Sequence, residues 1–119
     1  MSETYIRILK TGTLLRYETF VFSGGEIQVK FDKNHYRQIM EAIENGVEIM
    51  TRAKNSEELF RIALLKDALS NLGVKTIELF MPYLPYARQD RICVTGEAFS
   101  LKVLTNFINS LNFDKVTIY

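Results

Sequence analysis

The sequence is poor in cysteine, histidine and proline, and it has no long apolar run. Its 119 residues include a single cysteine, Cys93, so no disulfide can form within the chain, and a reducing compartment, the cytoplasm, is expected. No segment approaches the ~20 apolar residues that span a bilayer, and residues 1–5 lack the apolar core of a signal peptide. The single histidine, His35, leaves no Cys/His cluster for zinc. These absences predict a soluble protein without a membrane partner.

Positive charge is also too sparse for a nucleic-acid-binding surface. The 15 Lys and Arg residues against 14 Asp and Glu residues leave a net charge of +1, without a basic cluster. Nucleic-acid recognition needs clustered positive charge, so no nucleic-acid partner is expected. A chain of 119 residues, 47% of them hydrophobic, has the size of one domain, since domains usually hold ~100–200 residues. We expect residues 1–119 to form a single globular domain.

The first third of the chain has the pattern of strands followed by a helix. Residues 14–22 are rich in aromatic and β-branched side chains, and residues 27–31 alternate strictly between apolar and polar. Gly24 and Gly25 lie between the two runs, so we predict a β-hairpin with a primed turn, in which both glycines take positive φ. Residues 32–45 then carry apolar side chains at helical spacing and end in Asn-Gly, which predicts an amphipathic helix.

From residue 47 onward, strands and helices alternate. Asn55, followed three positions later by Glu58, predicts the start of a helix, and Gly73 predicts its end. Strands separated by helices of this length form right-handed crossovers in a parallel sheet, so we predict an α/β fold with a parallel sheet flanked by helices. One of these strands is mixed enough in composition to be covered on both faces. The expected elements are strands over 47–50, 75–81 (the mixed strand) and 115–119, and helices over 55–72 and 97–111.

The segment after strand 75–81 concentrates groups that can bind a phosphorylated ligand. Residues 81–91 are Met-Pro-Tyr-Leu-Pro-Tyr-Ala-Arg-Gln-Asp-Arg, and they follow the carboxyl end of a strand, where open parallel sheets bind ligands. A guanidinium such as that of Arg88 can clamp phosphate oxygens with two hydrogen bonds. The same residues also fit a surface loop with an ion pair between Asp90 and either Arg88 or Arg91, worth ~0–1 kcal/mol. The residue types alone leave both interpretations open.

Four segments resemble the ribose-phosphate pyrophosphokinases, also called phosphoribosyl-pyrophosphate synthetases. The run Tyr-Ala-Arg-Gln-Asp-Arg at residues 86–91 resembles the family signature, and Phe-Ser-Gly-Gly-Glu at residues 22–26 resembles its Phe-Ser-Asp/Asn-x-Glu hairpin. Residues 57–69 resemble its Asn-Asn-Leu-Met-Glu-Leu…Asp-Ala-Leu helix, and Ser-Leu-Lys at residues 100–102 stands where the family has Ser/Thr-Ala-Lys. The segments follow the family's order, and the resemblance extends from Phe22 to the end of the chain.

The resemblance implies an activity and a place within a larger enzyme. The family transfers the β,γ-diphosphoryl group of ATP to the C1 hydroxyl of ribose 5-phosphate, which yields phosphoribosyl pyrophosphate and AMP. Its subunit has two similar domains of phosphoribosyltransferase type, and this chain resembles the first. Because the chain stops inside an apparent strand, we expect a fragment that lacks the C-terminal half and is inactive alone. The Mg²⁺ ligands are expected beyond Tyr119, no catalytic residue is assigned within the chain, and a homo-oligomer is expected because subunits share ATP sites.

The resemblance also implies five residues of the ATP site. Arg88 and Gln89 are expected to contact ATP, with Arg88 as the phosphate ligand. The hairpin tip is expected to reach a neighbouring subunit's site, where Phe22 lies against adenine and Glu26 accepts a hydrogen bond from its amino group. Gly24 stands where the family has Asp or Asn, so one side-chain hydrogen bond to adenine is expected to be missing.

A second hypothesis is a non-catalytic homologue that serves as an oligomerisation or regulatory module. Gly24 supports it, as does segment 92–98, which lacks the additional basic residues and the proline of the family's mobile loop. The intact Arg-Gln-Asp-Arg run at residues 88–91 opposes it. His35 is expected to be solvated or to cap a helix, and Cys93 to be an incidental thiol, because no partner for catalysis is visible for either.

Overall fold

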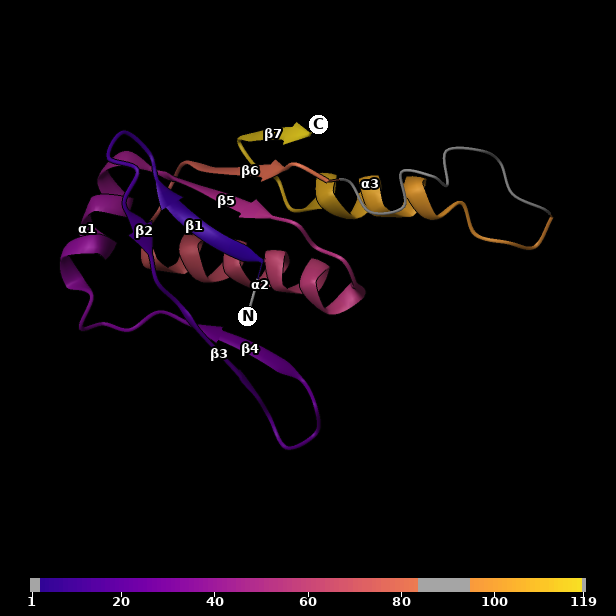
Figure 1. Cartoon of the computed structure of the whole chain (residues 1–119), viewed down its shortest axis with the longest axis horizontal. Helices are drawn as coiled ribbons and strands as arrows, with labels where there is room; N and C mark the ends of the chain where they lie inside the picture. The colour runs from indigo at the N-terminus through magenta and orange to yellow at the C-terminus, as the bar shows by residue number, and fades with distance from the viewer. Residues whose placement is uncertain (1–2, 84–94, 119) are drawn as a thin grey trace.

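The computed structural model describes residues 3–83 and 95–118, which form a five-stranded sheet, a separate two-stranded hairpin and three helices (Figure 1). The strands are β1 (Thr4–Ile8), β2 (Leu14–Leu15), β3 (Glu18–Val21), β4 (Ile27–Lys30), β5 (Val47–Thr51), β6 (Ile77–Met81) and β7 (Lys115–Ile118). The helices are α1 (Tyr36–Asn45), α2 (Ser56–Leu72) and α3 (Ser100–Ser110). Strands and helices thus alternate in the second half of the chain as predicted.

The main sheet has the strand order β2-β1-β5-β6-β7, and β5, β6 and β7 are parallel. This confirms the predicted α/β fold. β1 runs antiparallel to β5, and β2 runs antiparallel to β1. Residues 14–22 therefore divide between two sheets, where a single strand was expected. Between β2 and β3, the Tyr17 hydroxyl donates a hydrogen bond to the Thr4 carbonyl oxygen (2.6 Å), and the Tyr17 ring packs at a tilt near Phe31.

Helix α2 begins and ends at the residues that the sequence predicted. The Asn55 side chain accepts a hydrogen bond from the Glu58 backbone N–H at 2.9 Å. Gly73 closes the helix with a φ of 102°, a left-handed conformation that glycine adopts without a steric penalty. Glu57 and Glu58 lie in the first turn, where the helix dipole favours negative charge. The local signals were therefore sufficient to place this helix.

The other two helices start later than predicted. Asp32 accepts hydrogen bonds from the Asn34 N–H through its side chain (2.8 Å) and from the His35 N–H through its carbonyl oxygen (3.0 Å). This turn delays the start of α1 to Tyr36. His35 is the N-cap residue of α1, but its side chain makes no capping hydrogen bond. α3 begins at Ser100, three residues beyond the expected start.

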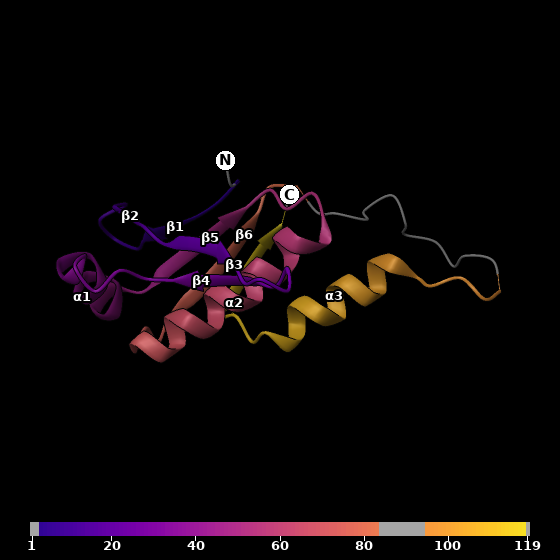
Figure 2. The ribbon, with the colours of Figure 1, turned by 90° about the horizontal axis from the view of Figure 1, so that it is seen from below.

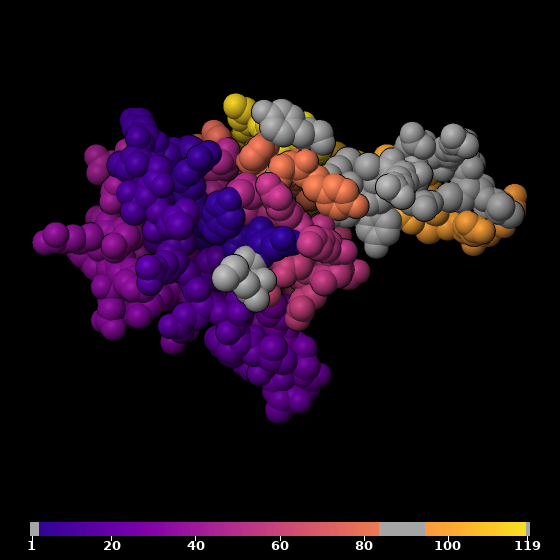
Figure 3. Space-filling view, in the orientation of Figure 1, coloured from indigo at the N-terminus to yellow at the C-terminus, as the bar shows by residue number. Residues whose placement is uncertain are grey.

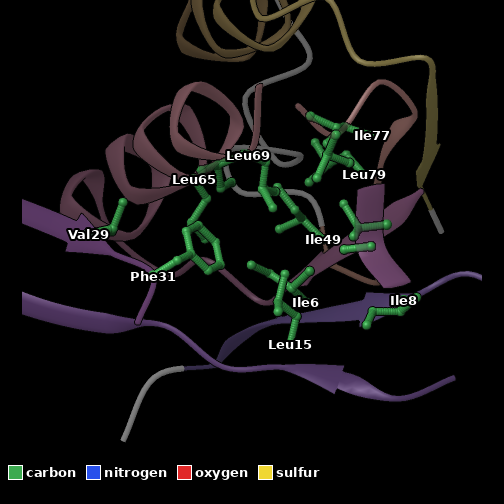
Figure 4. Packing of buried hydrophobic residues seen from close by; sticks show 14 of the residues in the cluster. Ile6, Ile8, Leu15, Val29, Phe31, Ile49, Leu65, Leu69, Ile77 and Leu79 are labelled. Atoms are coloured by element: carbon green, nitrogen blue, oxygen red, sulfur yellow. The ribbon is translucent and has the colours of Figure 1, made fainter. Parts of the chain in front are cut away.

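The hydrophobic core lies between the main sheet and the helices, which are all on one side of the sheet (Figure 2). Alternate side chains of β1, β5 and β6 point into this space, where they pack with Leu65 of α2 and with Phe31 beyond the end of β4 (Figure 4). The opposite face carries Tyr5 and Arg7, which are exposed, and the outward side chains of β6, which are half-buried. Among the described residues, helices cover one face of β6, so the prediction that strand 75–81 is covered on both faces is confirmed for one face and stays a prediction for the other.

Candidate functional site

The hairpin of β3 and β4 projects from the body of the molecule as a sheet of its own (Figures 1 and 3). All four residues of β3 are exposed. Val29 of β4 and the nearby Phe31 are buried in the core, and β4 lies beside α2. An isolated two-stranded hairpin is only marginally stable. Burial of Val29 and Phe31 therefore holds the hairpin to the body and leaves its tip accessible.

The turn at the hairpin tip differs from the predicted primed turn. The Gly25 N–H donates to the Phe22 carbonyl oxygen, and the Phe22 N–H donates to the Glu26 carbonyl oxygen, both at 2.8 Å. Gly25 has a φ of 94°, whereas Gly24 is not among the glycines with positive φ. The loop thus holds three residues, Ser23 to Gly25, and ends in a glycine bulge, so only its last residue needs a left-handed backbone. The prediction of a two-residue turn is wrong, because Glu26 pairs with Phe22 and not with Ser23, which leaves one more residue in the loop.

The tip presents an aromatic ring and a carboxylate to solvent. Phe22 is 47% exposed, and its ring is perpendicular (85°) to that of Phe20, with ring centroids 5.3 Å apart. The Glu26 carboxylate lies beside Gly24: a Cβ added to Gly24 would be 3.2 Å from Glu26 Cδ and closer still to Oε1. An aromatic face can stack on a planar base, and a carboxylate can accept a hydrogen bond from an amino group. The structure therefore brings together Phe22, Gly24 and Glu26 in an arrangement able to contact an amino-substituted purine.

The carboxyl end of β6 lies well away from the hairpin tip of the same chain (Figures 1 and 3). β6 ends at Met81, and Tyr83 beyond it is 56% exposed. Arg88 and Gln89, the two expected ATP contacts of the following segment, lie outside the described residues, as does Cys93. The positions of these three side chains therefore stay predictions.

A largely buried polar cluster at the carboxyl end of β5 was not predicted. The Thr4 and Thr51 hydroxyls are 2.7 Å apart, and Thr4 Oγ1 donates to Glu58 Oε2 at 3.1 Å. Glu58 Oε1 also lies 3.4 Å from Arg61 Nη1, and the two side chains are only 18% and 10% exposed. The spacing of three positions between Glu58 and Arg61 on a helix was the available signal. The cluster joins β1 and β5 to the first turns of α2, next to the strand ends where ligands of such sheets bind.

A groove of about 350 Å³ lies between α2 and α3. It is lined by Ser56, Leu59, Phe60, Ala98, Ser100, Val103, Leu104 and Phe107. None of these side chains is charged, so the groove lacks the groups that would neutralise a triphosphate.

Neither a metal cluster nor a membrane-spanning element is found in the described part of the chain. Within residues 3–83 and 95–118, no group of three or more His, Cys, Asp or Glu side chains could hold a metal ion. The helices found in these ranges are also too short or too polar to cross a membrane.

Comparison with known proteins gives one consistent match. Residues 6–111 match the family model of the N-terminal domain of ribose phosphate pyrophosphokinase. The chain is 30% identical over 113 residues to a ribose-phosphate pyrophosphokinase of Pyrococcus abyssi. That alignment covers 94% of this chain and 36% of the Pyrococcus protein. The chain is 33% identical over 87 residues to ribose-phosphate pyrophosphokinase 2 of Enterococcus faecalis, which covers 73% of this chain and 25% of that protein.

A solved structure supports the fold. The phosphoribosylpyrophosphate synthetase of Mycobacterium smegmatis superposes with a TM-score of 0.69 at 21% sequence identity. The superposition covers 91% of this chain and 35% of that one. The chain thus spans between a quarter and a little over a third of the length of these relatives.

Proposed function

Because the chain belongs to the ribose phosphate pyrophosphokinase family, as an N-terminal domain, we propose that it supplies the ATP contacts of a diphosphoryl-transferring enzyme. The complete enzyme transfers the β,γ-diphosphoryl group of ATP to the C1 hydroxyl of ribose 5-phosphate and releases AMP. The chain spans about a third of its relatives' length, so residues outside it bind ribose 5-phosphate. On its own the chain binds ATP weakly and does not turn over.

The observation that carries the proposal is the projecting hairpin tip, with its exposed Phe22 ring and its Glu26 carboxylate. Ligands of open parallel sheets bind beyond the carboxyl ends of the strands, and segment 84–94 follows β6 in the sequence. The tip projects away from this end of its own chain (Figure 1). A site that uses both segments is therefore completed by the tip of a second copy, which makes the protein a homo-oligomer.

Each residue has a role that its chemistry supports. The face of Phe22 stacks on adenine, and Glu26 accepts a hydrogen bond from the adenine amino group. The Arg88 guanidinium binds phosphate oxygens with two parallel hydrogen bonds, and the Gln89 amide adds a further polar contact to ATP. Diphosphoryl transfer depends mainly on positioning and on neutralising the charge of the phosphates. Arg88 provides positive charge for that purpose, and the ligands of Mg²⁺ are expected beyond Tyr119.

Subunit complementation in the full-length protein tests the shared site. Glu26→Ala and Arg88→Ala each remove one contact, and each variant alone is expected to lose ATP-dependent product formation. In mixed oligomers of the two variants, about a quarter of the sites pair an intact tip with an intact loop, because random pairing combines them in one of four ways. Product formation should then recover to about that fraction.

Two outcomes contradict the proposal, one of the complementation assay and one of a nucleotide titration of the Glu26→Ala variant. If the mixture is no more active than the average of the two single variants, tip and loop serve the same chain's site. If Glu26→Ala binds adenine and pyrimidine nucleotides with the same affinities as the unmodified protein, the adenine contact is wrong. Unfolding curves of both variants serve as the control for intact folding.

The alternative is a non-catalytic oligomerisation or regulatory module. Its support is Gly24, which leaves the tip with one polar side chain fewer than the family pattern, and segment 92–98, which lacks the additional basic residues of that pattern. This alternative also expects self-association, but it expects no nucleotide binding that depends on Glu26. Titration of the 119-residue chain with a non-hydrolysable ATP analogue separates the two functions.

A further inference from the structure

Phe20 and Phe22 form an aromatic pair on one face of the projecting hairpin. Phe20 lies in β3 and Phe22 follows the last residue of that strand, and side chains two positions apart along an extended chain point to the same side. Their ring centroids are 5.3 Å apart and the rings are nearly perpendicular, at 85°, which is a favoured edge-to-face arrangement. The pair is therefore a defined contact between two side chains at an otherwise exposed tip.

Both rings remain accessible, so the core does not determine their orientation. Phe20 is 42% exposed and Phe22 is 47% exposed. The residue opposite Phe20 on β4 is Gln28, whose side-chain oxygen accepts a hydrogen bond from the Val29 N–H. The Gln28 amide across from Phe20 is thus hydrogen-bonded to the next residue of its own strand. Among the described residues, the ring in contact with Phe22 is that of Phe20.

We propose that Phe20 is a positioning residue for nucleotide binding, because it holds the Phe22 ring in the orientation that stacks on the base. This inference rests on the proposed function, in which Phe22 contacts adenine. A ring that is oriented before binding loses less conformational freedom when the base arrives. Without Phe20, the affinity for an adenine nucleotide should fall about 2- to 10-fold, which corresponds to the entropy of one immobilised side chain.

The test compares four variants of the chain by calorimetric titration with a non-hydrolysable ATP analogue and with inorganic tripolyphosphate. Phe20→Leu removes the ring but keeps an apolar side chain of similar size. Phe20→Tyr keeps the ring. Val21→Ala is the matched control, because Val21 lies on the opposite face of the same strand and is 60% exposed. Phe22→Leu tests the adenine contact itself.

Phe20→Leu is expected to weaken binding of the ATP analogue about 2- to 10-fold and to leave tripolyphosphate binding unchanged. Phe20→Tyr and Val21→Ala should bind both ligands like the unmodified chain. The inference is overturned if Phe20→Leu binds the analogue normally while Phe22→Leu binds it weakly, a result that leaves the proposed function intact. It is also overturned if Phe20→Leu lowers the affinity for both ligands equally, since that indicates general damage to the fold.

A third result distinguishes failure of the adenine contact of Phe22 from failure of the positioning role of Phe20 alone. If neither Phe22→Leu nor Phe20→Leu changes the affinity for the analogue, the proposed adenine contact is wrong, and the positioning role of Phe20 is wrong with it. Melting temperatures of the four variants establish that each chain is folded at the temperature of the titration.

Discussion

The carboxylate of Glu26 lies in the space that a side chain at Gly24 would need. A Cβ at position 24 would approach Glu26 Cδ to 3.2 Å and Oε1 more closely. The absence of a side chain at Gly24 is therefore what permits this carboxylate position at the hairpin tip. Gly24 departs from the family pattern and Glu26 keeps it. A side chain at position 24 would collide with Glu26 in its observed position.

Replacing Gly24 by alanine should displace the Glu26 carboxylate without unfolding the hairpin. Gly24 does not have a positive φ, so alanine fits the backbone, and the free energy of unfolding should stay the same or rise by up to about 1 kcal/mol. Because Glu26 Oε1 ends a flexible, exposed side chain that can shift, the affinity for an ATP analogue should fall by no more than about 10-fold, the value of one hydrogen bond to a charged group. Chemical denaturation and calorimetric titration measure the two quantities.

Gly25→Ala provides the matched control for this prediction. Gly25 has a φ of 94°, and a Cβ added to it would have no other atom within 4 Å. Alanine there strains the backbone by about 1–2 kcal/mol but does not collide with Glu26. Unchanged affinity in Gly24→Ala would show that the observed carboxylate position is irrelevant to binding.

Arg88→Ala in the full-length protein should reduce ATP-dependent product formation about 10- to 100-fold, as expected for loss of a charge-assisted hydrogen-bonding group. Arg88→Lys should restore only part of the loss, because an ammonium group keeps the charge but not the planar, two-pronged geometry. Steady-state assays with ATP and ribose 5-phosphate measure the effect. Full activity of Arg88→Ala, with an unchanged unfolding midpoint, would remove Arg88 from the site.

Glu58→Ala should destabilise the fold by about 1–3 kcal/mol. Glu58 accepts a hydrogen bond from Thr4 Oγ1 and lies 3.4 Å from Arg61, so its loss leaves a largely buried guanidinium without this carboxylate. Glu57→Ala is the control, because Glu57 is exposed in the same turn of α2. Urea unfolding of both variants gives the comparison, and equal stability of the two would show that the Glu58 contacts contribute nothing.

Local signals in the sequence predicted the elements whose hydrogen bonds close within a few residues. Asn55 caps α2 through Glu58, three positions away, and Gly73 ends that helix. The alternation of residues 27–31 predicted the second strand of the hairpin. One prediction from a local signal was wrong. The Gly-Gly pair predicted a two-residue turn, but the pairing of the two strands leaves three residues in the loop.

Contacts between distant segments escaped prediction. The hydrogen bond from Thr4 to Glu58 spans 54 positions, and nothing in either segment indicates the other. Arg61 is only 8% exposed, although arginine side chains are mostly exposed in proteins. Residues 14–22 divide between two sheets, and Tyr17, which lies between β2 and β3, donates a hydrogen bond to the Thr4 carbonyl oxygen 13 positions away.

The sequence alone determined the succession of strands and helices, the ends of α2, and which aromatic and acidic groups stand at the hairpin tip. These properties follow from side-chain periodicity and from caps that act within one or two turns of the backbone. Only the tertiary structure decided that the helices cover one face of the sheet, that Arg61 is buried beside Glu58, and that the tip projects away from the carboxyl end of β6. Those outcomes depend on which faces of distant elements meet, and burial of apolar surface is specified by the assembled fold, not by any one segment.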